Sequence, residues 1–304
     1  MRRPASHWLM LFALVAMWGS GFLVIAIAVR AFSPSVFVML RLVLAAVLLT
    51  GLVYAQGLRF PADSRFWLSS LLIAVSGTCM PYWLITFGQQ EVESGLAGIL
   101  MGIMPLSTMA MAHFFVAGER LNPLTVVGFA LGFAGLAVLV GPSALLEIRG
   151  QSDLLIYELA ILGAAFCYAT NAIIARHRPP ADPQVAAAGA ILVGGVVMLP
   201  LGLWSAPAEL AAAPIGPLWA LLVSTVVQTA LGTVVFLRLV VVAGPSFTSF
   251  INYLIPVWAV LMGMIFLAER PGLGAFAALG LILGGIALSE LGRRRASADR
   301  NASS

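Results

Sequence analysis

The sequence predicts an all-α polytopic membrane protein, with ten transmembrane helices in two inverted five-helix repeats. Three observations lead to this fold class. Apolar residues make up 61% of the 304 residues and charged residues only 9%, whereas a soluble domain carries about 25% charged residues. Apolar runs of about 20 residues recur along the chain, and each is long enough to cross a bilayer as a helix. Motifs of the first half return in the same order in the second half, which indicates an internal duplication.

The first five predicted spans are separated by short connections that contain helix breakers. The run from Trp8 to Ala28 is too long for the apolar region of a signal peptide, so we interpret it as a retained helix. Ser33-Pro34, Arg59-Phe60-Pro61 and Asn122-Pro123 mark later connections. These signals place the spans at residues 8–28, 34–54, 66–87, 95–117 and 123–141.

The longest loop, Gly141 to Tyr157, is the midpoint of the chain, and five further spans follow it. These lie at residues 155–175, 184–204, 216–237, 246–267 and 273–291. The tail is rich in arginine and small polar residues and is expected to be disordered. The chain therefore divides into a first repeat at 1–145, a second, inverted repeat at 146–292, and a cytoplasmic tail at 293–304.

The arginines predict the orientation, because cytoplasmic loops of membrane proteins carry an excess of basic residues. All sixteen basic residues are arginine. With the N-terminus inside, twelve of them are cytoplasmic, Arg30, Arg149 and Arg270 are outside, and Arg41 lies within a span. This bias predicts that both termini are cytoplasmic and that the number of spans is even.

The two halves correspond at an offset of about 150 residues. Gly118-Glu119-Arg120 corresponds to Ala268-Glu269-Arg270, and Met104-Pro105-Leu106 to Ile255-Pro256-Val257, one residue out of step. Five spans per repeat is an odd number, so the second copy must enter the membrane from the opposite face. Inverted repeats of this kind are typical of secondary transporters, whose substrate site lies near the midplane between the halves.

Polar residues inside spans are the candidate site residues, because each one costs free energy unless a partner satisfies it. If their helix faces converge, they line a cavity of neutral hydrogen-bonding groups and aromatic rings suited to a small amphipathic solute. The alternative is that they join helices or bond back to their own backbone. The predicted cavity residues are Trp18, Ser20, Thr78, Tyr82, Tyr168, Asn171, Gln228, Thr229, Ser249, Asn252 and Tyr253, with Asn252 and Tyr253 as the leading substrate contacts.

Pro81, Pro105 and Pro256 sit inside spans and are predicted hinges or kinks, because proline removes a helix hydrogen bond. Arg41 could bind a substrate carboxylate, but the structural alternative, snorkelling to the interface or pairing with a carbonyl, is favoured. Glu269 is interpreted as a turn residue at a helix end.

Small residues four apart indicate close helix packing. The glycine pairs are Gly98 with Gly102, Gly128 with Gly132, and Gly280 with Gly284.

The sequence offers no catalytic residue, metal site or cofactor site. Cys79 and Cys167 both fall in apolar runs and are expected to be buried hydrophobes. No carboxylate lies at mid-span, and neither a nucleotide-binding loop nor a metalloprotease motif occurs. A membrane-embedded enzyme is therefore a poor fit. The net charge of +4 reflects arginines at span ends and does not indicate nucleic acid.

The chain resembles the EamA branch of the drug/metabolite transporter superfamily over residues 8 to 291. The resemblance lies in Trp18-Gly19-Ser20, in Met39-Leu40-Arg41-Leu42, and in the paired stretches from Pro105 to Arg120 and from Pro256 to Arg270. Within the superfamily it is most similar to bacterial aromatic amino acid exporters. The resemblance implies a central cavity between the first, third, fourth, sixth, eighth and ninth helices. The other four helices, and Arg41 with them, would be peripheral.

These observations predict a secondary transporter of the bacterial inner membrane that exports amino acids, aromatic or neutral, or related small metabolites by alternating access. A facilitator, or an exporter of other drugs or metabolites, is the alternative, and a membrane-embedded enzyme or a channel is a more distant one. The expected partners are a small-molecule substrate and the lipid bilayer, without nucleic acid, and the expected state is a monomer.

Overall fold

A computed structural model describes residues 4–115, 123–146 and 153–302, and these form helices joined by short turns, with no strand among them. The predicted turn Gly118-Glu119-Arg120 lies outside the described residues. In chain order the elements are α1 (Ala5–Gly19), α2 (Gly21–Ala28), α3 (Pro34–Ala55), α4 (Ser64–Ala74), η1 (Val75–Cys79), α5 (Met80–Gly88), α6 (Ser94–Met101), α7 (Met104–Phe115), α8 (Pro123–Leu146), α9 (Asp153–Arg176), α10 (Pro183–Gly202), α11 (Ala206–Ala212), α12 (Ile215–Val223), η2 (Ser224–Leu231), α13 (Gly232–Ala243), α14 (Pro245–Thr248), α15 (Ile251–Phe266) and α16 (Leu273–Ala302).

Eight helical stretches within the described residues are long and apolar enough to cross a membrane. Two shorter apolar helices, Pro123–Leu139 and Ile251–Phe266, occupy the places of the fifth and ninth predicted spans. The chain is therefore an all-helical, multi-pass membrane protein. α16 continues as a helix to Ala302, through the residues for which the sequence suggests a disordered tail.

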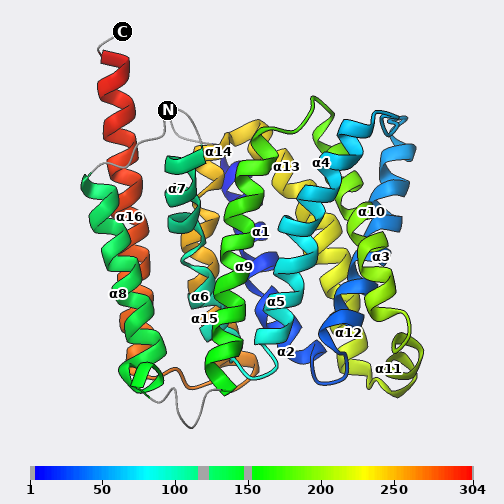
Figure 1. Ribbon diagram of the computed structural model, residues 1–304, viewed down its shortest axis with the longest axis horizontal. Helices are drawn as coiled ribbons and strands as arrows, with labels where there is room; N and C mark the ends of the chain where they lie inside the picture. The colour runs from blue at the N-terminus through cyan, green and yellow to red at the C-terminus, as the bar shows by residue number, and fades with distance from the viewer. Residues whose placement is uncertain (1–3, 116–122, 147–152, 303–304) are drawn as a thin grey trace.

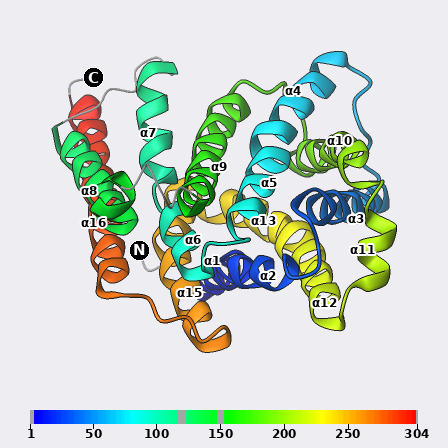
Figure 2. The same ribbon diagram turned by 60° about the horizontal axis from the view of Figure 1, so that its bottom comes forward.

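The helices form a bundle with a pair of helices at each end (Figure 1). α8 packs along α16 at one end, and α3 packs along α10 at the other. α1, α2, α5, α6, α9, α13 and α15 lie between these pairs, as the view turned by 60° also shows (Figure 2). α1 begins and α16 ends toward the same face of the bundle (Figure 1).

Side-chain caps begin three of the helices where the sequence places a Ser or Asp before the first turn. Ser33 Oγ accepts from the amide of Val36 at the start of α3, at 3.5 Å. Asp63 caps α4, and Asp182 caps α10 by accepting from the amide of Gln184 at 2.8 Å. These caps explain why the spans begin close to the predicted positions.

Glycines set the closest approach between α8 and α16. A Cβ on Gly128 would collide with the carbonyl oxygen of Gly285 and with Ser289 Oγ, and the collision is reciprocal for Gly285. By contrast, nothing lies within 4 Å of a Cβ placed on Gly280 or on Gly284. The predicted pair Gly280 and Gly284 therefore makes no close helix contact within the described part of the chain. Gly285 makes the contact because one residue turns the helix face by about 100°.

Two carboxylates join helices at the face of the bundle opposite the chain ends. Glu269 accepts from the backbone amides of Ser94 and Gly95, at 2.7 and 2.9 Å, and so caps the N-terminus of α6. Glu209 of α11 accepts from the amide and the hydroxyl of Ser33, at 2.8 and 2.9 Å. The interpretation of Glu269 as only a turn residue is wrong, because its side chain reaches a second span.

Candidate functional site

Several spans are interrupted partway along their length. α1 passes to α2 at Ser20, α6 passes to α7 through Gly102 and Ile103, and α14 passes to α15 at Ser249 and Phe250. Two spans contain π-helical stretches instead, η1 in the third predicted span and η2 in the eighth. π-helical turns inside α-helices are frequent at functional sites, since they leave backbone groups and side chains in irregular positions.

Arg41 of α3 reaches the η2 stretch and the α5 helix. Its Nε donates a hydrogen bond of 2.7 Å to Thr229 Oγ1, and its guanidinium carbon lies 4.0 Å from the centre of the Tyr82 ring. Tyr168 of α9, like Tyr82, packs against the main hydrophobic core. The structure therefore brings two predicted cavity residues, Tyr82 and Thr229, together around an arginine.

The peripheral placement expected for Arg41 is wrong for its side chain. α3 does lie at one end of the bundle, but Arg41 is only 5% exposed and points at η2 rather than at the lipid or the interface. Sequence reasoning ranked it below the uncharged residues because helix order says nothing about which way a side chain turns. The signal that could have found it is an ionisable residue within a span, which is a functional hypothesis by default.

A second polar cluster surrounds the break between α1 and α2. Trp18 Nε1 donates to the backbone carbonyl of Gln228 at 2.9 Å, and Trp258 Nε1 donates to Ser20 Oγ at 2.9 Å. Each tryptophan ring therefore ties this break to another interrupted span.

Gln228 has an unusual environment for an amide. Its side chain is 3% exposed and lies close to Gly21, where an added Cβ would be 3.5 Å from Gln228 Oε1. Both Oε1 and Nε2 are buried, and neither has a hydrogen-bond partner among the residues that the structure describes. An unpaired buried amide costs free energy, so it indicates a site that another group or another conformation satisfies.

The other predicted cavity residues make different contacts in the described part of the chain. Tyr253 Oη donates to the carbonyl of Ile286 in α16 at 3.4 Å. Thr78 bonds back to the carbonyl of Ala74 at 2.8 Å. Asn171 Oδ1 accepts from Ser76 Oγ at 3.4 Å and packs on η1. Ser249 and Asn252 are half-buried near the start of α15.

Two of the three predicted hinge prolines follow an interruption directly. Pro81 lies in the first turn of α5 behind η1, and Pro105 lies in the first turn of α7. Pro256 is inside α15 and packs near Gly102 at the break in the fourth span, where a Cβ would lie 3.6 Å from its ring.

Three residues of these interior surfaces were not predicted. Trp258 has been described above. Gln89 is buried and donates from Nε2 to the carbonyl of Phe22 at 2.8 Å. Glu158 of α9 is 5% exposed. The sequence analysis did not single them out, because only the packing of the helices shows that these side chains point inward.

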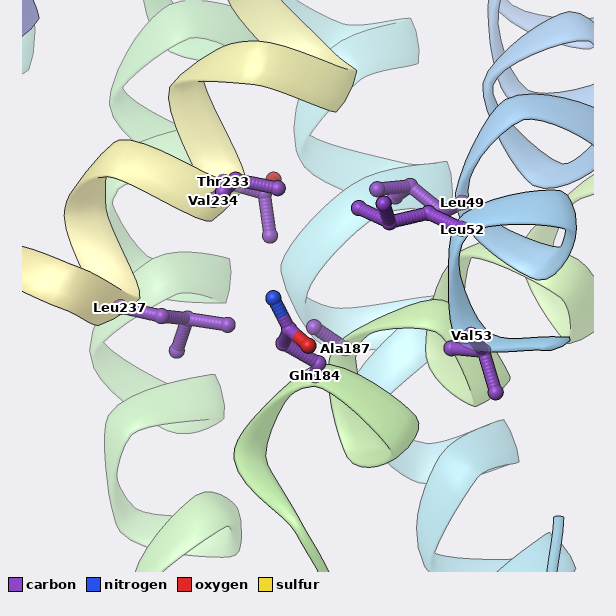
Figure 3. Close-up of a pocket in the computed structure, with 8 residues that line it drawn as sticks. All are labelled: Leu49, Leu52, Val53, Gln184, Ala187, Thr233, Val234 and Leu237. Carbon is purple, nitrogen blue, oxygen red and sulfur yellow. The ribbon is translucent and has the colours of Figure 1, made fainter. Parts of the chain in front are cut away.

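A small cleft, partly open to its surroundings, lies between α3, α10 and α13 (Figure 3). The amide of Gln184 extends toward its centre, with Leu49 and Leu237 on opposite walls (Figure 3). The walls are otherwise apolar, apart from Thr233. Within the described ranges, no three His, Cys, Asp or Glu side chains group as a metal site would require.

Comparison with known proteins identifies relatives along the whole chain. A model described as the EamA-like transporter family matches residues 6–141 and again residues 155–291. An uncharacterized inner membrane transporter of Escherichia coli (strain K12), YedA, is 32% identical over 130 residues, which is 42% of each chain, so the match spans less than half of that relative.

Other relatives match over nearly their full length. The uncharacterized transporter YvbV of Bacillus subtilis (strain 168) is 27% identical, over 92% of this chain and 90% of its own. A probable terminal-alkyne amino-acid exporter of Streptantibioticus cattleyicolor is 24% identical over 97% of both chains. One protein of known crystal structure is 20% identical, with a TM-score of 0.61 over 96% of this chain and 99% of its own, a likeness that concerns the fold alone.

Proposed function

This chain belongs to the EamA-like transporter family, and we propose that it exports amino acids, neutral or aromatic, or related small metabolites. It is a multi-pass transporter of the inner membrane. The relative named as a probable terminal-alkyne amino-acid exporter supports the amino acid class, and the tryptophan and tyrosine side chains of the interior support an aromatic or apolar side chain on the substrate.

The proposal includes ten spans in two inverted repeats, at 1–145 and 146–292, with both chain ends cytoplasmic. The two separate matches to one family model support a repeat, as do the π-helical stretches in the third and eighth spans. At one end of the bundle α3 packs along α10, so the second span contacts the seventh. At the other end α8 packs along α16, so the fifth span contacts the tenth. These are the pairings that a pseudo-two-fold axis between the repeats would produce.

The observation that carries the proposal is the meeting of interrupted helices in the bundle interior. Trp18 joins the α1–α2 break to η2, and Trp258 joins α15 to the same break. Interrupted helices expose backbone groups to a substrate site, and they let one part of a bundle move against another. Alternating access then consists of the repeats rocking about this interior, with Pro105 and Pro256 absorbing the bends.

The test is flux through proteoliposomes that contain the purified protein. Labelled tryptophan, phenylalanine, threonine and methionine are loaded, and efflux is followed with and without a pH gradient. Empty liposomes are the control. We expect efflux of at least one of the four above the control. If none moves under either condition, the amino acid assignment is overturned.

A further inference from the structure

We propose that Arg41 forms an anion subsite that takes the carboxylate of the transported molecule. The substrate class is then a compound with one free carboxylate, such as an amino acid, rather than a compound that lacks a carboxylate. This inference deepens the transport function proposed above and depends on it.

The first argument is the missing counter-ion. Arg41 is 5% exposed and is the one buried basic side chain among the described residues. Within that part of the chain, no carboxylate lies within ion-pairing distance of it, and its hydrogen bond is to a neutral hydroxyl. A guanidinium remains charged at any accessible pH, and burying a charge without a partner costs several kcal/mol. An anion that arrives with the substrate would offset that cost.

The second argument is which donors remain open. Nε of Arg41 is used by Thr229 Oγ1, at 2.7 Å, while its two terminal nitrogens have no hydrogen-bond acceptor among the described residues. These two nitrogens form the end of the guanidinium fork, the edge that accepts a carboxylate through two parallel hydrogen bonds.

The third argument is that the fork is held in place. Thr229 Oγ1 accepts from Arg41 and donates to the carbonyl of Ser224 at 2.9 Å, so both roles of the hydroxyl are used. The donation spans five residues, which is the spacing of the π-helix η2. The Tyr82 ring, 4.0 Å from the guanidinium carbon, supports the plane from one side. A preorganised fork loses little entropy when an anion binds.

The fourth argument is the charge of the ligand. The chain contains no lysine, and Arg41 is the one buried basic side chain among the described residues. The single guanidinium matches the single negative charge of a carboxylate group, whereas a phosphate dianion would leave an excess negative charge in the membrane interior. The chemistry therefore favours a carboxylate over a phosphate.

The test compares acids with their amides in two measurements. The first is the thermal shift of the purified protein with tryptophan, phenylalanine, threonine or methionine, with the amide of each, and with inorganic phosphate. The second is proteoliposome efflux of the labelled acids and amides. The variants are Arg41→Gln, Arg41→Lys and Thr229→Val, and Arg238→Gln is the control because Arg238 is exposed on α13.

We expect the wild-type protein and Arg238→Gln to favour at least one acid over its amide by about tenfold or more in apparent affinity. Arg41→Gln should remove this preference, and Arg41→Lys and Thr229→Val should reduce it, with amide binding unchanged. Thr229→Val keeps the buried charge and so tests the subsite even if Arg41→Gln does not fold.

Several results would overturn the subsite: equal shifts with acid and amide, a larger shift with phosphate, no shift with any acid, or a preference that survives in Arg41→Gln. A shift that depends on Arg41, without efflux of any compound, would overturn the transport function and leave the subsite standing. Efflux without discrimination between acid and amide would overturn the subsite and leave transport standing.

Discussion

Glu269 provides a direct test of how the bundle is held together at the face opposite the chain ends. Its carboxylate, half-buried, spans from the end of α15 to the first two amides of α6, at 2.7 and 2.9 Å. Ser94 and Gly95 are both buried, so water cannot easily replace the carboxylate at these amides. The perturbations are Glu269→Ala, which removes both acceptors, and Glu269→Gln, which keeps one oxygen and removes the charge.

The expected magnitude follows from the two hydrogen bonds and the helix end. Loss of a side-chain cap costs about 0.5–2 kcal/mol, and loss of a negative charge at a helix N-terminus adds about 0.3–1 kcal/mol. We expect Glu269→Ala to lower the free energy of unfolding by about 1–3 kcal/mol and Glu269→Gln by about half as much. At about 2–4 °C per kcal/mol, Glu269→Ala should melt about 2–12 °C lower.

The assay is thermal unfolding of the purified protein in one detergent, followed by intrinsic tryptophan fluorescence. Glu91→Ala is the matched control, because Glu91 is exposed in the turn before α6. A melting temperature for Glu269→Ala within about 1 °C of this control would refute the reasoning, since the two amides would then be satisfied without the carboxylate.

Two further predictions concern buried groups. Gln228→Leu removes an amide whose nitrogen and oxygen lack partners among the described residues. It should therefore raise the free energy of unfolding by about 1–3 kcal/mol and the melting temperature by a few degrees, while lowering efflux. A lower melting temperature would mean that the amide is paired. Gly128→Ala should lower the free energy of unfolding by about 1–3 kcal/mol and the melting temperature by several degrees, because the added Cβ collides with the backbone of Gly285. Gly280→Ala is the control, since no described atom lies within 4 Å of its added Cβ, and it should be neutral or slightly stabilising.

The helical, membrane-spanning character and the start of most spans were predictable, because they depend on local properties. A bilayer requires about 20 apolar residues per helix, and breakers such as Ser33-Pro34 lie between the runs. The interruption at Ser20 was not predicted, and neither was η2. A run of apolar residues has the same composition whether its backbone forms α-helical or π-helical bonds.

The candidate site was predicted in part. Tyr82 and Thr229 converge on Arg41, while Tyr253 turns toward α16. Periodicity identifies the residues that share a face of one helix, but it leaves open which neighbour that face meets. Tyr253 lies on the polar face that was predicted to line the cavity, but its ring points toward α16, in the outer pair α8 and α16, rather than toward the bundle interior.

The sequence by itself determined that this chain crosses a membrane repeatedly as helices, because backbone groups in lipid must be satisfied within each span and only long apolar runs meet that requirement. Tertiary structure alone decided the roles of Arg41, Gln228 and Glu269. The roles of Arg41 and Glu269 depend on partners 188 and 175 residues away in the sequence. The role of Gln228 depends on its buried amide having no hydrogen-bond partner among the described residues. Such pairings arise from the rotation and packing of whole helices, in which a change of one residue turns a side chain by about 100°.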